Sequence, residues 1–475
     1  MTETTARDDT VPGASDSELK RSITGRLLFF YVLGDVLGSG IYVLIGLVAG
    51  AVGGAFWIAF AVGVTIATIT GLAYAELVTK YPQAAGAALY VNKAFRSTPL
   101  TFLVTVTFLA ASFAAAGSLA TGFSSYFAEL WELPPALLIS IVFILLLAVV
   151  NYIGITESVV ANMLMTFVEI AGLVIVMITG VWYVAEGKAD FGQLTDFTTD
   201  GNPAFALLAG VALAFFAMTG FENAANVAEE TINPSRTFPR ALVGGMAAAG
   251  VIYVLVAITA ALTVPNKTLA DSDAALLEVI EAGILPIPVG LMTTLFAVIA
   301  MVAITNTTLV AVVTQSRILY GMAREDVVPG VFAKVHSSRR SPWVALIFAA
   351  VVVTGLLVVG ALLNNAGVGV DVVERLSLVT VVLTLAIYLM VIAACLKLTN
   401  SDVHDDSFRA PRALLAIGIL GNFALLAYVV IDDPFSLVWC AGLIAVGGIL
   451  YAVEYFFGTK TAARDKHGVT TSKEI

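Results

Sequence analysis

LGDVLGSGIY, residues 33–42, interrupts the first long apolar run of the sequence, which extends from about residue 26 to 50. Three glycines and a serine lie near the middle of this run, beside the ionisable residue Asp35. Glycine destabilises a helix by roughly 1 kcal/mol relative to alanine, so the run is a poor continuous helix. In a bilayer, a broken helix is tolerated only where protein covers it or where it lines a cavity. The stretch therefore predicts a discontinuous membrane helix at a functional site.

A second interruption of the same kind lies five apolar runs later. Residues 215–223 read FFAMTGFEN and place Gly220 and Glu222 inside the apolar run 203–228. Corresponding broken helices in two halves of a chain indicate an inverted-repeat transporter with its solute site near the bilayer midplane. Glycines four residues apart, such as Gly34 and Gly38, also let helices pack closely, so packing is the alternative explanation of the first break.

The composition predicts a membrane protein. Of the 475 residues, 59% are hydrophobic and 12% are charged, whereas a soluble domain has roughly 25% charged residues. Apolar runs of about 20 residues, long enough to cross a hydrocarbon core of roughly 30 Å, recur along nearly the whole chain. We expect an all-α integral membrane protein with about twelve spans, at 26–50, 55–78, 98–128, 134–153, 159–184, 203–228, 240–264, 286–317, 342–363, 375–396, 412–430 and 435–457.

These spans predict the organisation of the chain. The expected fold is a 5+5 inverted repeat with discontinuous first and sixth helices, plus two peripheral helices. The first 24 residues are polar and lack the apolar core of a cleavable signal, so the first span is expected to stay as an anchor. The predicted parts are a cytoplasmic tail (1–24), a first repeat (25–185), a second repeat (203–397), two further spans (411–457) and a second cytoplasmic tail (458–475).

Lysine and arginine predict the orientation. With the amino terminus inside, the cytoplasmic segments hold all of these residues except Lys188, Lys267 and Arg375, as the positive-inside rule requires. Both termini are therefore predicted to be cytoplasmic, with the chain in the inner (plasma) membrane. The net charge of −10 comes largely from expected outer loops and indicates no nucleic-acid partner. No pattern predicts a disulfide, a metal site, a cofactor or an oligomeric state.

In these residues the chain resembles the amino acid-polyamine-organocation superfamily. Its members resemble one another in a GSGIY or GSGIF segment in span one and a GFE segment in span six, and both occur here, at 38–42 and 220–222. The similarity continues in residues 74–90, 229–239 and 317–329, and later spans match only by hydropathy. The resemblance implies a ten-helix inverted-repeat core, with the last two spans outside it, that moves amino acids or related amines by alternating access.

The resemblance also implies a solute site at the two breaks. The amides of Ser39, Gly40 and Ile41 would bind a substrate carboxylate at the start of a half-helix, where the helix dipole favours an anion. Freed carbonyls in span six would accept the substrate ammonium group, and the ring of Phe216 would cover the site, although aromatic rings also fill apolar interiors. The expected substrate-binding residues are Val36, Ser39, Gly40, Ile41, Phe216, Thr219 and Gly220.

Three carboxylates lie deep in predicted spans and have no lysine or arginine nearby in the sequence. An ionisable residue inside a membrane is a candidate functional residue by default, and a protonated acid bonded to unwound backbone is the alternative. The three are Asp35, Glu169 and Glu222, which we expect to act in coupling or gating. Glu76, at the cytoplasmic end of span two, is expected to be structural, because interfacial charges cost less than buried ones.

Glu169 departs from the pattern of the superfamily. Many sodium-independent relatives have a lysine here, which takes the place of a bound sodium ion beside spans one and eight. An acid at this position leaves room for a proton or a metal ion. We expect H⁺ rather than Na⁺, because a proton neutralises the acid without a coordination shell.

Together these features predict a secondary active transporter for an amino acid or a polyamine-like amine, coupled to protons. An exchanger, a uniporter and a non-transporting amino acid sensor share every motif and stay open as alternatives. No HExxH motif, phosphate loop or set of acid, base and nucleophile occurs, so an enzyme is not expected. The sequence does not choose among neutral amino acids, cationic amino acids and amines.

Overall fold

The computed structural model describes residues 23–82, 86–131, 134–153, 158–197, 202–282, 288–324, 327–336, 341–401 and 407–457, which are mostly helical. No strand occurs in these residues, apart from one isolated bridge between Ile23 and Thr231. The helices in chain order are α1 Gly25–Leu37, α2 Gly40–Val52, η1 Gly54–Phe56, α3 Trp57–Lys80, α4 Gly86–Phe95, α5 Thr98–Ala128, α6 Ala136–Ile153, α7 Ser158–Ala185, η2 Phe191–Thr195, α8 Pro203–Ala217, η3 Phe221–Glu230, α9 Pro234–Thr263, α10 Asn266–Asp271, α11 Ala275–Glu281, α12 Val289–Arg324, η4 Gly330–Ala333, α13 Trp343–Asn365, α14 Val372–Lys397, α15 Arg412–Asp432 and α16 Pro434–Phe457.

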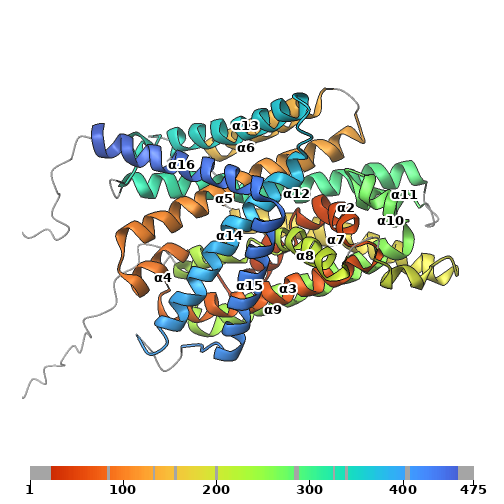
Figure 1. Cartoon of the computed structure of the whole chain (residues 1–475), viewed down its shortest axis with the longest axis horizontal. Helices are drawn as coiled ribbons and strands as arrows, with labels where there is room; N and C mark the ends of the chain where they lie inside the picture. Colours follow the sequence, from red (N-terminus) through yellow and green to blue (C-terminus); the bar gives the residue numbers. More distant parts are fainter. Residues whose placement is uncertain are drawn as a thin grey trace, which may run out of the picture.

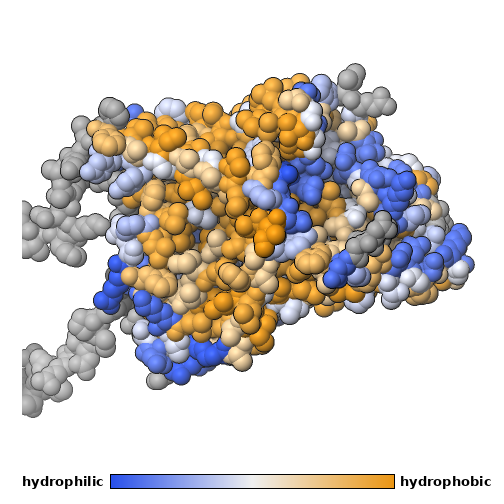
Figure 2. All heavy atoms as spheres, in the orientation of Figure 1, coloured by the Kyte–Doolittle hydropathy of each residue, from blue (hydrophilic) through white to orange (hydrophobic). Residues whose placement is uncertain are grey.

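Twelve helical segments in the described residues are long and apolar enough to cross a membrane, which confirms the predicted number. The long helices α5, α6, α12 and α13 run along the long axis of the molecule (Figure 1). In the view of Figure 2, hydrophobic side chains gather over the broad middle and hydrophilic ones gather towards the ends. Large apolar side chains such as Leu146 and Val351 are more than half exposed. A surface of this kind is stable against lipid, so the chain is a multi-pass membrane protein.

Two boundaries differ from the prediction by more than a few residues. The seventh span begins at Pro234, not near 240, because proline is well tolerated in the first turn of a helix and α9 continues through Pro239. The eighth span continues to Arg324, seven residues past the predicted end at 317. Its last two turns contain polar residues, so hydropathy marks the end of the apolar run and not the end of the helix.

The first and sixth spans are both interrupted, as predicted. In the first, α1 ends at Leu37, Gly38 has non-helical angles (φ −32°, ψ −154°), and α2 begins at Gly40. In the sixth, α8 ends at Ala217 and a 3₁₀ helix follows Gly220, whose φ of 117° is a conformation that favours glycine. In the most apolar stretch of the first span, 94% of the residues are buried. The first break is therefore covered by protein.

The two interrupted spans are also joined at one end. The amide of Ile23, just before α1, donates to the carbonyl of Glu230 at 2.9 Å, and the amide of Ile232 donates to the carbonyl of Ile23 at 2.9 Å. Ile23 and Thr231 form the single parallel bridge of the described chain. The start of the first span is therefore fixed to the end of the sixth.

Candidate functional site

A cavity lies where the two interrupted spans meet. Both breaks contribute to its wall, together with α5, α12 and α14. Of the expected substrate-binding residues, Ile41 alone does not line it, and of the three deep carboxylates, Glu169 does not. The lining residues are Asp35, Val36, Gly38, Ser39, Gly40, Phe108, Ala111, Ser112, Ala115, Leu119, Phe216, Ala217, Thr219, Gly220, Glu222, Asn223, Thr307, Ala311, Thr314, Thr380 and Thr384.

The backbones of the two breaks touch at two glycines. A methyl group on Gly40 would lie 2.4 Å from the Cα of Ala217, and one on Gly220 would lie 2.8 Å from the carbonyl oxygen of Asp35. Real Cβ atoms essentially never come closer than 3.0 Å to such atoms. Any larger residue at either position would push the two spans apart. The absence of a side chain at these glycines therefore allows the two breaks to lie against each other at the cavity.

Glycine also allows close packing around the first break. A methyl group on Gly34 would lie 1.8 Å from Oγ1 of Thr166, and one on Gly38 would lie 2.0 Å from Oγ1 of Thr307. The packing alternative therefore holds for these two glycines. It does not replace the break, because Gly38 both packs against α12 and interrupts the helix.

Tyr253 of α9 joins the C-terminal ends of α1 and α8, which are the first halves of the two broken spans. Its hydroxyl donates to the carbonyl of Val36 and also lies 3.3 Å from the carbonyl of Ala217. The final turns of α1 and α8 therefore converge on one hydroxyl proton. Sequence reasoning missed Tyr253, because a tyrosine in an apolar span carries no signal that separates it from a core residue.

Several of the expected backbone donors and acceptors are bonded inside the protein. The amide of Ser39 donates to Oγ1 of Thr307 at 3.2 Å. The carbonyl of Phe216 accepts from the amide of Thr219 at 3.1 Å and from its hydroxyl at 2.7 Å. A carbonyl oxygen has two lone pairs. Phe216 accepts two hydrogen bonds already, so its carbonyl is less open to a ligand than the sequence suggests.

The start of α2 retains open donors. The amides of Gly40 and Ile41 lie in the first turn of the helix, where no intrahelical acceptor exists. The carbonyl of Gly220 accepts from the amide of Asn223 at 2.8 Å, which leaves one lone pair. The amides of α2 and the carbonyls around Gly220 thus offer opposite polarity to the cavity.

The two carboxylates of the cavity have different partners. Oδ2 of Asp35 accepts from Nδ2 of Asn223 at 3.1 Å. Oε2 of Glu222 accepts from the amide of Gly220 at 2.9 Å and from the hydroxyl of Tyr388 at 2.7 Å. None of the ion pairs found among the described residues includes either carboxylate. Both acids are buried, so a cation in the cavity would interact strongly with them.

Glu169 lies outside the cavity, fully buried between α7, α2 and α12. Its Oε1 accepts from Nδ2 of Asn306 at 3.0 Å, and its Oε2 has no partner among the described residues. Oδ1 of Asn306 accepts from Nδ2 of Asn162 at 3.3 Å, and Oδ1 of Asn162 also lacks a partner there. The hydroxyl of Tyr42 donates to the carbonyl of Glu169 at 2.8 Å. A buried acid with an open oxygen thus lies beside spans one and eight, one hydrogen bond from the broken span.

Residues 25–458 match the family model described as an amino acid permease. The chain belongs to the amino acid permease family. The match covers all twelve spans, so the resemblance seen in the motifs of the first eight extends to the last four.

Three relatives show how wide this permease family is. Cationic amino acid transporter 9, a chloroplastic protein of Arabidopsis thaliana, is 28% identical over 362 residues, which cover 70% of this chain and 61% of the plant protein. The chain thus spans less than two thirds of that relative. The methylthioribose transporter of Bacillus subtilis is 28% identical over 385 residues, which cover 76% of this chain and 80% of the relative. The branched-chain amino acid permease BcaP of the same organism is 25% identical over 362 residues, covering 70% and 74%.

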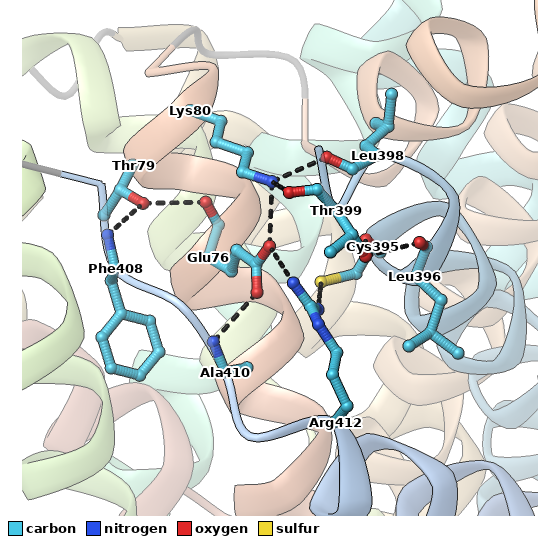
Figure 3. A network of polar contacts seen from close by, with 10 residues as sticks. All are labelled: Glu76, Thr79, Lys80, Cys395, Leu396, Leu398, Thr399, Phe408, Ala410 and Arg412. Atoms are coloured by element: carbon cyan, nitrogen blue, oxygen red, sulfur yellow. Dashed lines mark hydrogen bonds and ion pairs between the residues drawn. The ribbon is translucent and has the colours of Figure 1, made fainter. Parts of the chain in front are cut away.

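Away from the cavity, the permease holds a buried ion cluster around Glu76 (Figure 3). Lys80 Nζ lies 2.9 Å and Arg412 Nη2 lies 3.0 Å from Oε1 of Glu76, and the amide of Ala410 donates to Oε2 at 2.9 Å. Lys80 Nζ also donates to the carbonyl of Leu398 at 2.7 Å. Glu76 was expected at the interface, but its side chain has no exposed area. Two cations make this burial possible, and the cluster ties α3 to the connection between α14 and α15.

Proposed function

We propose that this permease is a secondary active transporter, and not an enzyme, that moves an amino acid or a related amine by alternating access. The observation that carries the proposal is the meeting of the two broken spans at one cavity. Broken helices place free backbone groups near the midplane, where transporters of this kind bind solutes. Two of the relatives are named for amino acids, which supports that solute class, and the name of a third keeps methylthioribose-like solutes as an outcome.

The polarity of the cavity suits the two ends of a zwitterion. The amides of Gly40 and Ile41 would bind the carboxylate at the positive end of α2, and the amide of Ser39 would join them when the solute displaces Thr307. The carbonyls of Val36 and Gly220 can each accept one further hydrogen bond and would bind the ammonium group.

The side chains of span six would complete the solute site. The ring of Phe216 lines the cavity and would cover the bound solute. Thr219 holds its own hydroxyl on the carbonyl of Phe216, which keeps the end of α8 in place. Glu222 would act in gating, because its hydrogen bonds to Gly220 and Tyr388 join the second break to α14.

We assign the coupling of transport to protons to Glu169, which would bind and release the coupled proton. An ionised carboxylate with one open oxygen is strongly disfavoured in a buried site. A proton removes the charge directly, whereas sodium would need several oxygen ligands around the same position. The hydroxyl of Tyr42, in α2, donates to the backbone carbonyl of Glu169. A change in the charge state of Glu169 would therefore affect a contact of α2, the second half of the first broken span.

Transport into proteoliposomes tests the assignment. The solute is the amino acid or amine that most raises the unfolding temperature in a panel, because binding stabilises the folded state. An inward pH gradient should drive its accumulation without sodium. Glu169→Gln should abolish this drive and retain exchange across the membrane, and Glu186→Gln, on an exposed loop, should behave like the wild type.

Each other outcome has a definite meaning. Accumulation that follows a sodium gradient and ignores pH would contradict the proton assignment. Exchange without accumulation in the wild type would indicate an exchanger or a uniporter. Binding without any flux would indicate a sensor. Full gradient-driven uptake by Glu169→Gln would leave this acid a structural role only.

We further propose that the chain lies in the plasma membrane with both termini in the cytoplasm. The distribution of lysine and arginine supports this orientation. It places Gly187 outside and Lys334 inside, and both residues are exposed. In cells whose protein carries one introduced cysteine, a membrane-impermeant maleimide should label Gly187→Cys and spare Lys334→Cys. The reverse pattern would overturn the orientation.

A further inference from the structure

The cavity at the two breaks has unbalanced charge. Among the described residues that line it, Asp35 and Glu222 are carboxylates, and none is lysine, arginine or histidine. Neither carboxylate takes part in an ion pair of the described chain. An unpaired charge is strongly disfavoured away from water, and a bound cation offsets that cost. The cavity therefore favours a positively charged solute.

The two carboxylates are not equally available to a solute. Oε2 of Glu222 already accepts from the hydroxyl of Tyr388 and from the amide of Gly220. Asp35 accepts one hydrogen bond, from Asn223, and no other described residue bonds its carboxylate. A carboxylate offers about four lone-pair sites. Most of the capacity of Asp35 is therefore open at the wall of the cavity.

Helix dipoles add to the negative potential near Asp35. Both α1 and α8 end at the cavity, and the carbonyl end of a helix carries a partial negative charge. The start of α2 offers positive polarity for one anionic group, the carboxylate of an amino acid. Once the two ends of a zwitterion are matched to the backbone, the charge of Asp35 is still unbalanced.

A second feature of the cavity indicates a polar ligand. The hydroxyl of Ser39, in a residue that is 1% exposed, has no hydrogen-bond partner among the described residues and lies in the cavity wall. Buried polar groups are nearly always bonded, so an open one at a cavity points to a missing partner. The part of the wall formed by α5, α12 and α14 carries further hydroxyl-bearing side chains, at Ser112, Thr314, Thr380 and Thr384. Its described residues have no positive charge that would repel a basic group.

We infer that Asp35 binds a second basic group of the solute, so that the solute is a basic amino acid or a diamine with net positive charge. The inference rests on the proposed transport function and names the solute class of the same cavity. It also gives Asp35 a role in binding the solute, in place of the coupling role expected from the sequence. Glu169, outside the cavity, keeps the coupling role.

Thermal unfolding of the purified full-length permease tests this inference with two matched probes. L-Norleucine has the carbon chain of L-lysine and lacks the ε-amino group. In the wild type, lysine should bind at least about tenfold more tightly than norleucine, because a hydrogen bond between charged groups contributes about that factor. In Asp35→Asn the ratio of the two affinities should fall to about one. Asn223→Ala removes the neutral partner of Asp35 and keeps the charge, so it should keep the ratio.

The outcomes separate the inference from the proposed function. Norleucine that binds the wild type as tightly as lysine would overturn the inference and leave an amino acid transporter. Failure of lysine, norleucine, putrescine and every other amino acid to bind would overturn the proposed function itself. A ratio unchanged in Asp35→Asn would assign the basic group to another residue. If that variant does not fold, Nε-acetyl-lysine decides in the wild type. Its side chain is uncharged, so binding as tight as that of lysine contradicts the inference.

Discussion

The hydroxyl of Tyr253 donates a hydrogen bond to the backbone carbonyl of Val36. The same hydroxyl lies 3.3 Å from the carbonyl of Ala217, so a residue of α9 joins the last turns of α1 and α8. These two half-helices end at the cavity, and neither could move away from α9 without breaking this contact. Tyr253 therefore fixes the position of both breaks relative to each other.

Tyr253→Phe should lower the stability of the permease. The variant leaves two buried carbonyls without their shared donor, and an unsatisfied buried polar group costs about 1–3 kcal/mol. Tyr90→Phe is the matched control, because the hydroxyl of Tyr90 is buried and has no partner among the described residues. Unfolding temperatures in detergent compare the two. A loss in Tyr253→Phe no larger than the loss in Tyr90→Phe would mean that the hydrogen bonds of the Tyr253 hydroxyl do not hold the breaks.

Gly220→Ala should reduce transport and stability together. A non-glycine residue with φ near 117° carries backbone strain of about 1–3 kcal/mol, and the new methyl group would lie 2.8 Å from the carbonyl oxygen of Asp35. Gly367→Ala is the control, because Gly367 also has positive φ (81°) and no atom lies within 4 Å of a methyl group there. Solute uptake measures transport and the unfolding temperature measures stability in both variants. Similar losses would show that backbone strain alone explains Gly220.

The two breaks could be predicted from the sequence because their cause is local. Glycine, serine and a carboxylate within an apolar run weaken the helix at that point, whatever packs against it. The partners of the breaks are not local. Thr307 lies 268 residues after Ser39, and no rule of spacing indicates that its hydroxyl would accept the amide of Ser39. The sequence therefore located the cavity and could not say which of its donors are free.

Gly40 and Glu76 show the same limit in two other ways. The sequence predicts that the amide of Gly40 faces a solute, and it gives no sign that a methyl group on Gly40 would lie 2.4 Å from the Cα of Ala217. A valine at Gly40 would thus disturb packing whether or not a solute binds there. Glu76 was expected at the membrane surface because it lies near the end of a span. Its partner Arg412 lies 336 residues away, and hydropathy gives no sign that the two would meet.

Blocking either end of the amino acid should abolish binding. The proposed site uses amides for the carboxylate and carbonyls for the ammonium group, so N-acetylation or esterification removes one set of contacts. Competition against uptake of the parent amino acid measures this, with the N-acetyl derivative and the methyl ester of that same amino acid as competitors. Derivatives that compete as well as the free amino acid would contradict a site with two polar ends.

Glu76→Gln should strongly destabilise the permease without changing its affinity for solute. The variant removes a buried negative charge. It leaves the ammonium group of Lys80, which has no exposed side-chain area, with neutral partners only, among them two backbone carbonyls. Removing one partner of a buried pair costs about 3–5 kcal/mol, because the other charge stays buried. None of the residues of the cluster lines the cavity, so the loss should appear in the unfolding temperature and not in solute affinity.

Two comparisons identify the cause of this loss. The double variant Glu76→Gln with Lys80→Met leaves no unpaired lysine, so it should be more stable than Glu76→Gln alone, and a double-mutant cycle gives the coupling between the two residues. Glu186→Gln breaks the pair with Lys188, whose side chains are 41% and 54% exposed, and should leave the unfolding temperature nearly unchanged, since solvent screens exposed pairs. If Glu76→Gln is no worse than Glu186→Gln, the cluster does not hold α15 to the core. The contact of α15 with α3 and α14 must then rest on apolar packing and on the hydrogen bond from Nδ2 of Asn422 to Oγ1 of Thr70.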